Sequence, residues 1–477
     1  MNVMQTRRDL LKGSVWMGAA AFLSGCLGDG LKLCGPCGAP MQGFAAPKLG
    51  RVRVGVVGLG YRGSAAVRRL LAVPGVEITA LCEVREEQLA KSVADCAKKG
   101  VPAPQTFSDE EGWKRLCDSD RVDVVYNCAP WHLHAPVAAS AMEHGKHAFV
   151  EVPAAMTVDE CWQLVETSER TKRHCMMLEN ACYDEWALLF LSLCRKGLLG
   201  ELIHAEGGYL HDRRWQVFND SQWKSWRREW NRLHGGNQYP MHGLGPIAQD
   251  LDINRGDRFD YLVSVDSHQV GYERFARETL PEGDPRRNLR FKMSDMNVTT
   301  IRTALGRTIL LEHDVTSPRP KSEMVLVSGT KGCARAFPKP GIYLEKSFPT
   351  KPYHGAYDEA ETQRLRREHM HPYWKTAGEI AAKVGGHGGC DFLMDLRWVY
   401  CLRNGLPLDM VVYDLAAWCS ICELSERSAD SRASAQDVPD FTRGGWKTAA
   451  PLGLVDVDIR KAGIGQGVGK VEGQFAI

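Results

Sequence analysis

The chain has 477 residues, of which 44% are hydrophobic and 25% charged, and its formal net charge is +2. The length allows two domains with large cores, and the composition is that of a globular protein without a nucleic-acid-binding surface, so no nucleic-acid partner is expected. The 16 cysteines are scattered singly, without the paired CxxC motifs of a structural zinc site.

The N-terminal segment, residues 1–26, has the pattern of an export signal. Thr6–Lys12 resembles the twin-arginine motif, an apolar stretch too short to span a bilayer follows, and Leu23–Cys26 resembles a lipoprotein cleavage box. We expect export by the twin-arginine route and a periplasmic or membrane-anchored lipoprotein, with Cys26 as the candidate for a lipid anchor. A plain cleaved signal with an incidental cysteine is the alternative. Residues 27–49 have the composition of a flexible linker.

Residues 50–180 have the pattern of a Rossmann dinucleotide-binding domain. A solidly apolar strand, Val52–Val57, leads into the GxGxxG sequence Gly58-Leu59-Gly60-Tyr61-Arg62-Gly63, and a helical pattern follows. Glycines there allow a tight turn and bring a pyrophosphate onto the helix N-terminus. The strand Val76–Cys82 ends at Glu83, where a carboxylate accepts hydrogen bonds from the adenosine ribose and repels a 2′-phosphate. The pattern therefore predicts NAD as the cofactor.

Three later strand-like segments end at the same carboxyl edge of the sheet, where ligands of α/β proteins bind. They are followed by the candidate cofactor residues Trp131, His132, Leu133, His134, Glu151, Val152 and Asn180. His132 and His134 could instead be metal ligands, but no carboxylate cluster lies nearby in the sequence, so we predict no metal site.

Residues 181–447 have a different pattern. A helix near Glu185–Lys196 is followed by successive strand-like segments, which predict an α+β domain with a large, mostly antiparallel open sheet. The segments are Glu201–Leu210, Phe259–Val270, Met296–Ala304, Arg307–Val315 and Glu323–Ser328. Residues 448–477 form a C-terminal extension, and the segment from Asp437 onward could reach a neighbouring subunit of a homo-oligomer.

Several long motifs carry a family resemblance, among them "EVPAAMTVDECW", "HCMMLENACYD", "YPMHGLGPIAQ" and "CLRNGLPLDMVVYD". They resemble glycoside hydrolase family 109, the NAD-dependent N-acetylgalactosaminidases, within the wider Gfo/Idh/MocA oxidoreductase-like superfamily. The resemblance covers residues 50 to 447 and implies a glycan or glycoside substrate.

The resemblance also implies site residues. NAD contacts fall on the residues after the strand ends named above. Sugar contacts fall on Tyr209, Arg228, Tyr239, Pro240, Met241, His242 and Lys321. Two of these depart from the family pattern: the family often has threonine at the position of Met241, and generally has tyrosine at the position of Lys321. An acidic or sulfated neighbouring group would suit Lys321; a surface lysine that swings outward is the alternative.

The resemblance implies an unusual route to hydrolysis. NAD takes hydride from sugar C3, the C2 proton is removed, the C1 oxygen leaves, water adds, and the hydride returns to C3. His242 and Tyr239 are our candidates for the C3 hydroxyl proton, and Tyr183 for the C2 proton or the leaving group. A structural role for His242 as a helix cap, and packing as well as function for His387, remain alternatives.

Val152 bears on the competing functions. Sugar dehydrogenases that the chain resembles usually carry lysine there, and a transient oxidation can dispense with it. The alternatives are an exported sugar oxidoreductase with tightly bound NAD(P), against which Val152 argues, and a catalytically inactive sugar-binding lipoprotein, against which the full set of His and Tyr residues argues.

Overall fold

The computed structural model describes residues 40–219, 225–346 and 355–463. The predicted export signal, its cleavage box and most of the predicted linker lie outside the described residues. Within the described ranges, no helix combines the length and the apolar character that a membrane crossing requires.

The first half of the chain forms a six-stranded parallel sheet with the strand order β3-β2-β1-β4-β5-β6. This is the order of a doubly wound dinucleotide-binding fold. The strands are β1 (Val52–Val57), β2 (Val76–Cys82), β3 (Gln105–Phe107), β4 (Val124–Asn127), β5 (His147–Val150) and β6 (Cys175–Met177). Side chains on both faces of β4 and β5 are buried, as in parallel sheets covered by helices on either side.

The helices of this half connect the strands in sequence. They are α1 (Tyr61–Leu70), α2 (Glu86–Lys98), α3 (Gly112–Asp118), α4 (His134–Glu143) and α5 (Val158–Thr171), with short 3₁₀ helices at Trp131–Leu133 and Asn180–Tyr183.

The second half forms an eight-stranded sheet with the order β13-β12-β11-β7-β10-β9-β8-β14, in which only the β7–β10 pair is parallel. The strands are β7 (Leu202–Leu210), β8 (Phe259–Asp266), β9 (Asn297–Thr303), β10 (Thr308–Asp314), β11 (Ser322–Gly329), β12 (Gly332–Arg335), β13 (Gly341–Leu344) and β14 (Gln436–Asp437). Alternate residues of β9 are buried, so one face of this sheet is covered. The expected Rossmann domain followed by an α+β domain with a mostly antiparallel sheet is confirmed.

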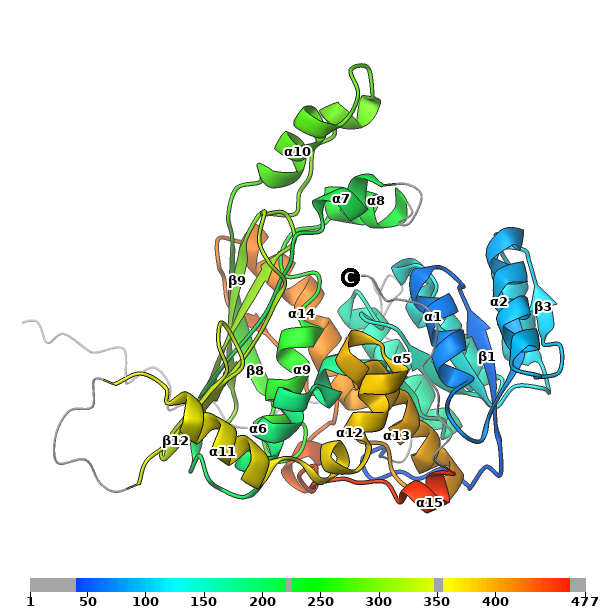
Figure 1. The fold of residues 1–477 in the computed structure, drawn as a ribbon. Coiled ribbons are helices and arrows are strands. Elements are labelled where there is room, and N and C mark those ends of the chain that lie inside the picture. Colours follow the sequence, from blue (N-terminus) through cyan, green and yellow to red (C-terminus); the bar gives the residue numbers. More distant parts are fainter. Residues whose placement is uncertain (1–39, 220–224, 347–354, 464–477) are drawn as a thin grey trace, which may run out of the picture. The chain divides into compact units, whose positions relative to one another are not determined.

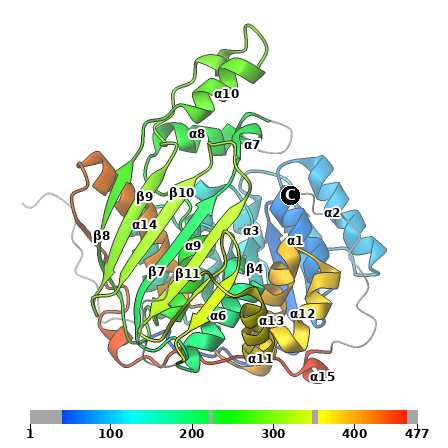
Figure 2. The same cartoon turned by 60° about the vertical axis from the view of Figure 1, so that its left-hand side comes forward.

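The helices of the second half lie mainly on one face of this sheet (Figures 1 and 2). They are α6 (Glu185–Arg195), α7 (Arg214–Phe218), α8 (Ser225–Leu233), α9 (Met241–Asp250), α10 (Gly271–Thr279), α11 (Glu359–His369), α12 (Pro372–Val384), α13 (Cys390–Asn404), α14 (Val412–Asp430) and α15 (Ile459–Ala462). α9 packs on β7 and β11, and α14 contacts both β8 and the Rossmann elements α5 and β6.

Glycines bring α9 unusually close to β7. A Cβ atom at Gly243 would lie 2.2 Å from the backbone nitrogen of Gly208, and one at Gly207 would lie 2.5 Å from the carbonyl oxygen of Gly243. Only glycine permits this approach. It places the first turn of α9, which carries His242, directly beside the strand that carries Tyr209.

The chain returns to the Rossmann domain through α13, which packs on α1 and β1. Buried ion pairs join the two helices: Arg69 Nε lies 2.7 Å from Asp395 Oδ2, and Arg62 Nη1 lies 3.1 Å from Asp391 Oδ2. The loop before α13, Gly385–Gly389, has positive φ at every residue, including +45° at His387. Glycine on both sides allows this loop to turn tightly against α1.

The segment after α14 folds onto its own chain. Gln436 and Asp437 pair with β8, and Phe441 is 1% exposed and packs on Trp162 with ring centroids 4.7 Å apart. Residues 437–441 thus make contacts within the chain, and the idea that the segment from Asp437 onward also reaches a neighbouring subunit stays a prediction.

Candidate active site

Two adjoining cavities lie at the carboxyl edge of the Rossmann sheet. The larger has a volume of about 670 Å³ and is lined by residues of both domains; the smaller, of about 110 Å³, follows the glycine-rich turn. Both are lined by Tyr61, Arg62, Cys128, Ala129 and Trp226. A ligand bound along the glycine turn would therefore extend into the larger cavity.

The glycine-rich turn fits a dinucleotide. Gly58 has φ +81°, and a Cβ atom there would lie 2.7 Å from the backbone of Cys128 and Ala129. A Cβ atom at Gly63 would lie 1.8 Å from the carbonyl oxygen of Gly58, whereas at Gly60 the nearest atom would be the Arg85 side chain at 3.7 Å. No side chain caps α1 at Gly60 and no acidic residue lies in its first turn, so its positive end suits a pyrophosphate.

Glu83 lines the smaller cavity at the end of β2. Its carboxylate accepts hydrogen bonds from the backbone nitrogens of Leu59, at 2.8 Å, and Arg85, at 3.0 Å. Burial would raise the pKa of Glu83, but the hydrogen bonds from Arg85 and Leu59 lower it below its usual value. An ionised carboxylate retains acceptor sites for ribose hydroxyls, as the sequence-based assignment requires.

Most of the other predicted cofactor residues meet in the larger cavity: Trp131, His134, Glu151, Val152 and Asn180. His132 is exposed, and neither it nor Leu133 lines a described cavity. The ring nitrogens of His134 lie 2.6 Å from the Pro153 carbonyl and 2.7 Å from the Ala129 carbonyl, so the ring holds backbone and not a metal. Val152 lies in the cavity wall, at the position where the sugar dehydrogenases that the sequence resembles usually carry lysine.

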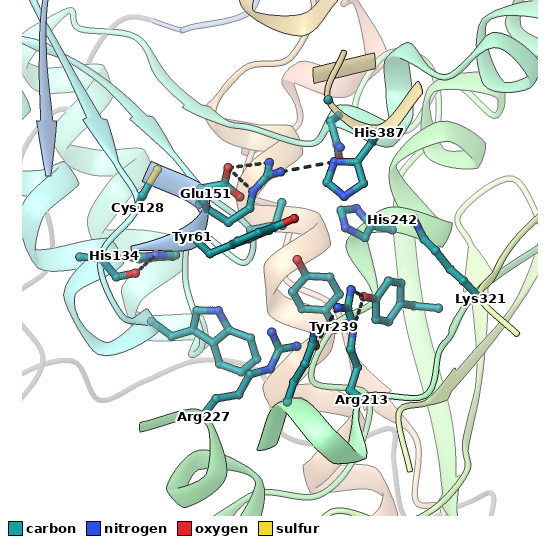
Figure 3. Close-up of a pocket in the computed structure, with 18 of the residues that line it drawn as sticks. Tyr61, Cys128, His134, Glu151, Arg213, Arg227, Tyr239, His242, Lys321 and His387 are labelled. Atoms are coloured by element: carbon teal, nitrogen blue, oxygen red, sulfur yellow. Dashed lines mark hydrogen bonds and ion pairs between the residues drawn. The ribbon is translucent and has the colours of Figure 1, made fainter. Parts of the chain in front are cut away.

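His242 faces this cavity from the first turn of α9 (Figure 3). Its Nδ1 lies 2.6 Å from Oε1 of the fully buried Glu179. Burial alone would lower the pKa of His242, but the charge of Glu179 and their hydrogen bond raise it above its usual value. The N-cap residue of α9 is Pro240, and no side chain makes a capping hydrogen bond there, so His242 does not cap the helix. The geometry is that of an oriented acid or base.

Two tyrosines stand beside His242. The Tyr209 and Tyr239 ring centroids lie 5.3 and 5.0 Å from that of His242, and 4.9 Å from each other. Burial raises the pKa of Tyr239 well above its usual value, so its hydroxyl is a proton donor rather than a base at neutral pH.

The structure changes the assignment of the substrate arginine. Arg227, not Arg228, lines the cavity, and its guanidinium carbon lies 4.7 Å from the Trp131 ring centroid and 5.2 Å from that of Tyr239. Arg228 instead points to the carbonyl of Val217, at 3.2 Å. The two residues differ by one position in α8, which corresponds to about 100° around the helix. Arg213 also lines the cavity and was missed.

Tyr183 lies outside the cavity lining and is buried in the core. Its hydroxyl donates to Asp409 Oδ2 at 3.0 Å, and Asp409 pairs with Arg397. The prediction that Tyr183 acts on the C2 proton or the leaving group is therefore not supported by its position. Pro240 and Met241 are likewise buried and do not line the cavity.

Lys321 lines the cavity, but it does not extend freely toward a ligand. Its Nζ lies 2.9 Å from Glu323 Oε1. Burial would lower the pKa of Lys321, and the Glu323 carboxylate raises it, so the amine is charged and already paired. The alternative of a lysine that swings outward to the surface does not hold.

The histidine of a second histidine–carboxylate pair lines the same cavity. His387 Nδ1 is 2.9 Å from Asp391 Oδ2, and Arg62 links the same carboxylate to Glu151, whose Oε1 lies 2.8 Å from Arg62 Nη2. Figure 3 shows His387 and His242 facing the same space. The sequence left function and packing open for His387. In the structure its imidazole lines the cavity, and the contact with Asp391 orients the ring.

Two family models match the chain. "Glycosyl hydrolase 109, C-terminal domain" covers residues 183–448, and "Oxidoreductase family, NAD-binding Rossmann fold" covers residues 52–179.

Curated relatives match over almost the same span. A glycosyl hydrolase family 109 protein of Shewanella pealeana is 44% identical over 88% of this chain and 91% of its own length. An alpha-N-acetylgalactosaminidase of Bacteroides fragilis is 44% identical over 85% of this chain and 95% of its own.

Solved structures resemble the chain in fold. A levoglucosan dehydrogenase complex with NADH and levoglucosan has a TM-score of 0.60 at 19% identity, covering 82% of this chain and 100% of its own. An aldose-aldose oxidoreductase of Caulobacter crescentus complexed with glycerol has a TM-score of 0.56 at 17% identity, covering 81% and 100%. At such identity these likenesses show the fold alone.

The matching family models and relatives establish that this chain, a glycoside hydrolase with an NAD-binding Rossmann domain, belongs to glycosyl hydrolase family 109.

Proposed function

We propose that the protein hydrolyses terminal N-acetylgalactosamine, or a related hexosaminide or galactoside, by transient oxidation of the sugar. One observation carries the proposal: the dinucleotide cavity and the cavity with His242 and Tyr239 share five wall residues. A nicotinamide at the end of the cofactor groove would therefore meet a sugar held against these side chains. The activity of the Bacteroides fragilis relative suggests the sugar.

Bound NAD would supply the hydride acceptor for sugar C3 and the donor that later restores C3, and oxidation at C3 would acidify the proton on C2. Glu151 lines the larger cavity, and its carboxylate is held by Arg62, which lines both cavities, so Glu151 suits positioning the nicotinamide ribose and the sugar.

His242 holds the proton of the C3 hydroxyl. Glu179 fixes its Nδ1, which leaves Nε2 for the substrate. Tyr239 donates a hydrogen bond to the same oxygen, since its raised pKa keeps the phenol protonated.

With Tyr183 outside the cavity, the proton work at C2 and C1 falls to His387. Asp391 fixes its Nδ1 in the same way, and a neutral imidazole can take the C2 proton and deliver it to the leaving C1 oxygen. In this division His242 acts at C3, and His387 acts at C2 and C1.

The test uses the purified protein without added NAD and the p-nitrophenyl α- and β-N-acetylgalactosaminides. We expect steady nitrophenol release, no net build-up of reduced cofactor, and exchange of the C2 proton with solvent deuterium. A purified protein that remained fully active after removal of all dinucleotide would overturn the proposal. Stoichiometric cofactor reduction, or dependence on a second sugar, would instead favour the sugar oxidoreductase.

We also propose export by the twin-arginine route, lipid attachment at Cys26 and a homo-oligomer. The first two rest on residues 1–26 of the sequence. Labelled fatty acid should be incorporated into the wild type and not into Cys26→Ala, and replacing Arg7 and Arg8 by lysine should retain the chain in the cytoplasm. Light scattering coupled to gel filtration would measure the oligomeric state.

A further inference from the structure

We propose that the sugar pocket is built for a substrate with an anionic substituent, a sulfate or a carboxylate, and that Arg213 binds this group. The inference rests on the proposed hydrolysis of a glycoside in the larger cavity and narrows its substrate class. It concerns a residue that neither the glycine turn nor the histidine pairs explain.

Arg213 is anchored but not neutralised. Its Nη2 and Nε donate to the Tyr209 hydroxyl at 2.6 and 3.1 Å, and its Nη1 donates to Gln216 Oε1 at 2.7 Å. All these acceptors are uncharged. Within the described residues, no carboxylate lies within ion-pairing distance, 4.0 Å, of its guanidinium. The neighbouring Arg214, in contrast, is paired with Asp212 at 2.7 Å.

Further positive charge surrounds Arg213. Arg227 lines the same cavity, and its guanidinium carbon lies 5.2 Å from the ring centroid of Tyr239, which lies 4.9 Å from that of Tyr209, the residue that Arg213 contacts. Burial lowers the pKa of Arg227, and the charge of Arg213 adds to that effect. Burial, together with the charges of Arg213 and Lys321, lowers the pKa of His211 to about 4, so this imidazole is neutral. Neither ring nitrogen of His211 has a hydrogen-bond partner in the described part of the chain. Glu323 is paired with Lys321 and not with Arg213.

The Arg213 guanidinium lies on the sugar side of the site. Arg213 follows β7 and lines the larger cavity, and it is not among the residues that line the dinucleotide cavity. The pyrophosphate therefore does not account for it. A guanidinium fork suits sulfate and carboxylate oxygens, and a half-buried cation without a counter-ion gains most when a ligand provides one.

A simpler role for Arg213 is to hold the Tyr209 hydroxyl, and the two roles predict different results. Loss of a positioning contact lowers activity on charged and neutral substrates alike. Loss of an anion-binding contact changes the ratio between them.

The experiment compares kcat/KM of the NAD-loaded protein on matched substrates. The pairs are p-nitrophenyl N-acetylgalactosaminide against its 4- and 6-sulfates, and p-nitrophenyl galactoside against the galacturonide; the first pairs report a sulfate and the last a carboxylate. We expect the wild type to prefer the anionic member of at least one pair. Arg213→Gln should reduce that preference about 10- to 100-fold, the range for loss of a hydrogen bond to a charged group.

Matched variants sharpen the result. Arg214→Gln removes an equivalent arginine that is already paired and should keep the wild-type ratio. Lys321→Tyr should change the ratio less than Arg213→Gln, because Glu323 already engages the amine. Arg213→Lys, which keeps the charge without the fork, should retain part of the preference and serves if Arg213→Gln does not fold.

Equal ratios in wild type and Arg213→Gln, or a wild type that prefers the neutral member of every pair, would overturn the inference while leaving NAD-dependent hydrolysis intact. If no glycoside is hydrolysed, the proposed function fails. The inference is then decided by calorimetry of the free neutral, sulfated and uronic sugars with each variant: a preference for the anionic sugar that Arg213→Gln abolishes supports it, and its absence overturns it.

Discussion

His242 and His387 face one cavity from two different kinds of backbone. His242 is the second residue of the ten-residue helix α9, held against β7 by glycine contacts, and its side chain is 13% exposed. His387 lies in a loop with positive φ at each residue, and its side chain is 33% exposed. The first is fixed by packing, whereas the second depends on its hydrogen bond and on the glycines around it.

Their carboxylates differ as well. Glu179 has His242 as its only ion-pair partner within the described residues. Asp391 is shared by Arg62, Arg69, Asn180 and His387. Burial would raise the pKa of Asp391, but the arginine charges hold it well below its usual range. Glu179 therefore raises the pKa of His242 alone, whereas Asp391 both orients His387 and forms ion pairs between α1 and α13.

The largest expected effect is on His242. His242→Gln removes the proton acceptor at the C3 oxygen and should lower kcat by roughly 10²- to 10⁴-fold, the usual value of a general base. His144→Gln, at an exposed histidine outside the cavity, should change nothing. A His242→Gln variant within a few-fold of wild type in steady-state kinetics would remove His242 from the proton chemistry.

The role of the shared Asp391 carboxylate in holding the domains together is tested by the unfolding free energy of Asp391→Asn. Asp391→Asn leaves Arg62 and Arg69 with Glu151 and Asp395 as remaining partners, so the loss of unfolding free energy should be about 3 kcal/mol, the lower end for a broken buried pair. Urea denaturation measures it. Glu359→Gln, which breaks the exposed Lys339–Glu359 pair, should cost almost nothing. A loss for Asp391→Asn as small as this would mean that the shared carboxylate does not hold the domains together.

The effect of replacing His387 on kcat/KM should depend on the leaving group of the substrate. If His387 takes the C2 proton and delivers it to the C1 oxygen, His387→Gln should lower kcat/KM for both substrates, and roughly 10²-fold more for a sugar leaving group than for p-nitrophenol, which leaves without protonation. The two substrates act as each other's control. Equal losses on both would restrict His387 to positioning or to the C2 proton.

Local signals in the sequence predicted the parallel strands other than β3, the glycine turn and the residues at the strand ends, because apolar periodicity and glycine conformation are short-range properties. Lys321 and Glu323 are two apart near the start of β11, where a period of two puts side chains on one face, so their pairing also had a local signal that went unused.

The remaining site residues depend on long-range packing. Arg227 and Arg228 could not be distinguished from the sequence, since one helical step decides which arginine meets the cavity. Tyr183 is hydrogen-bonded to Asp409, 226 positions away, and Arg62 to Asp391, 329 positions away. The periodicity of the sequence does not predict such long-range contacts. The sequence placed Asn180 at the right sheet edge, but the pairing of the adjacent Glu179 with His242 follows from the approach of α9 to β7.

The smallest effect isolates what Glu179 contributes to His242. His242 must be neutral to accept a proton, so its raised pKa sets the acidic limb of kcat/KM above pH 6.5. Glu179→Gln removes the two largest contributions that raise the pKa of His242 and leaves burial and the charges of Glu323 and Lys321, so the pKa falls and the limb should move to lower pH. The pair also stabilises the fold, fully so below the unfolded pKa of about 6.5 and less as pH rises through the folded pKa; Glu179→Gln should therefore flatten the dependence of Tm on pH in that window. A pH–rate profile and melting curves from pH 5 to 9 measure both. An acidic limb that does not move would mean that a group other than His242 limits the rate, and would place the proton acceptor elsewhere in the cavity.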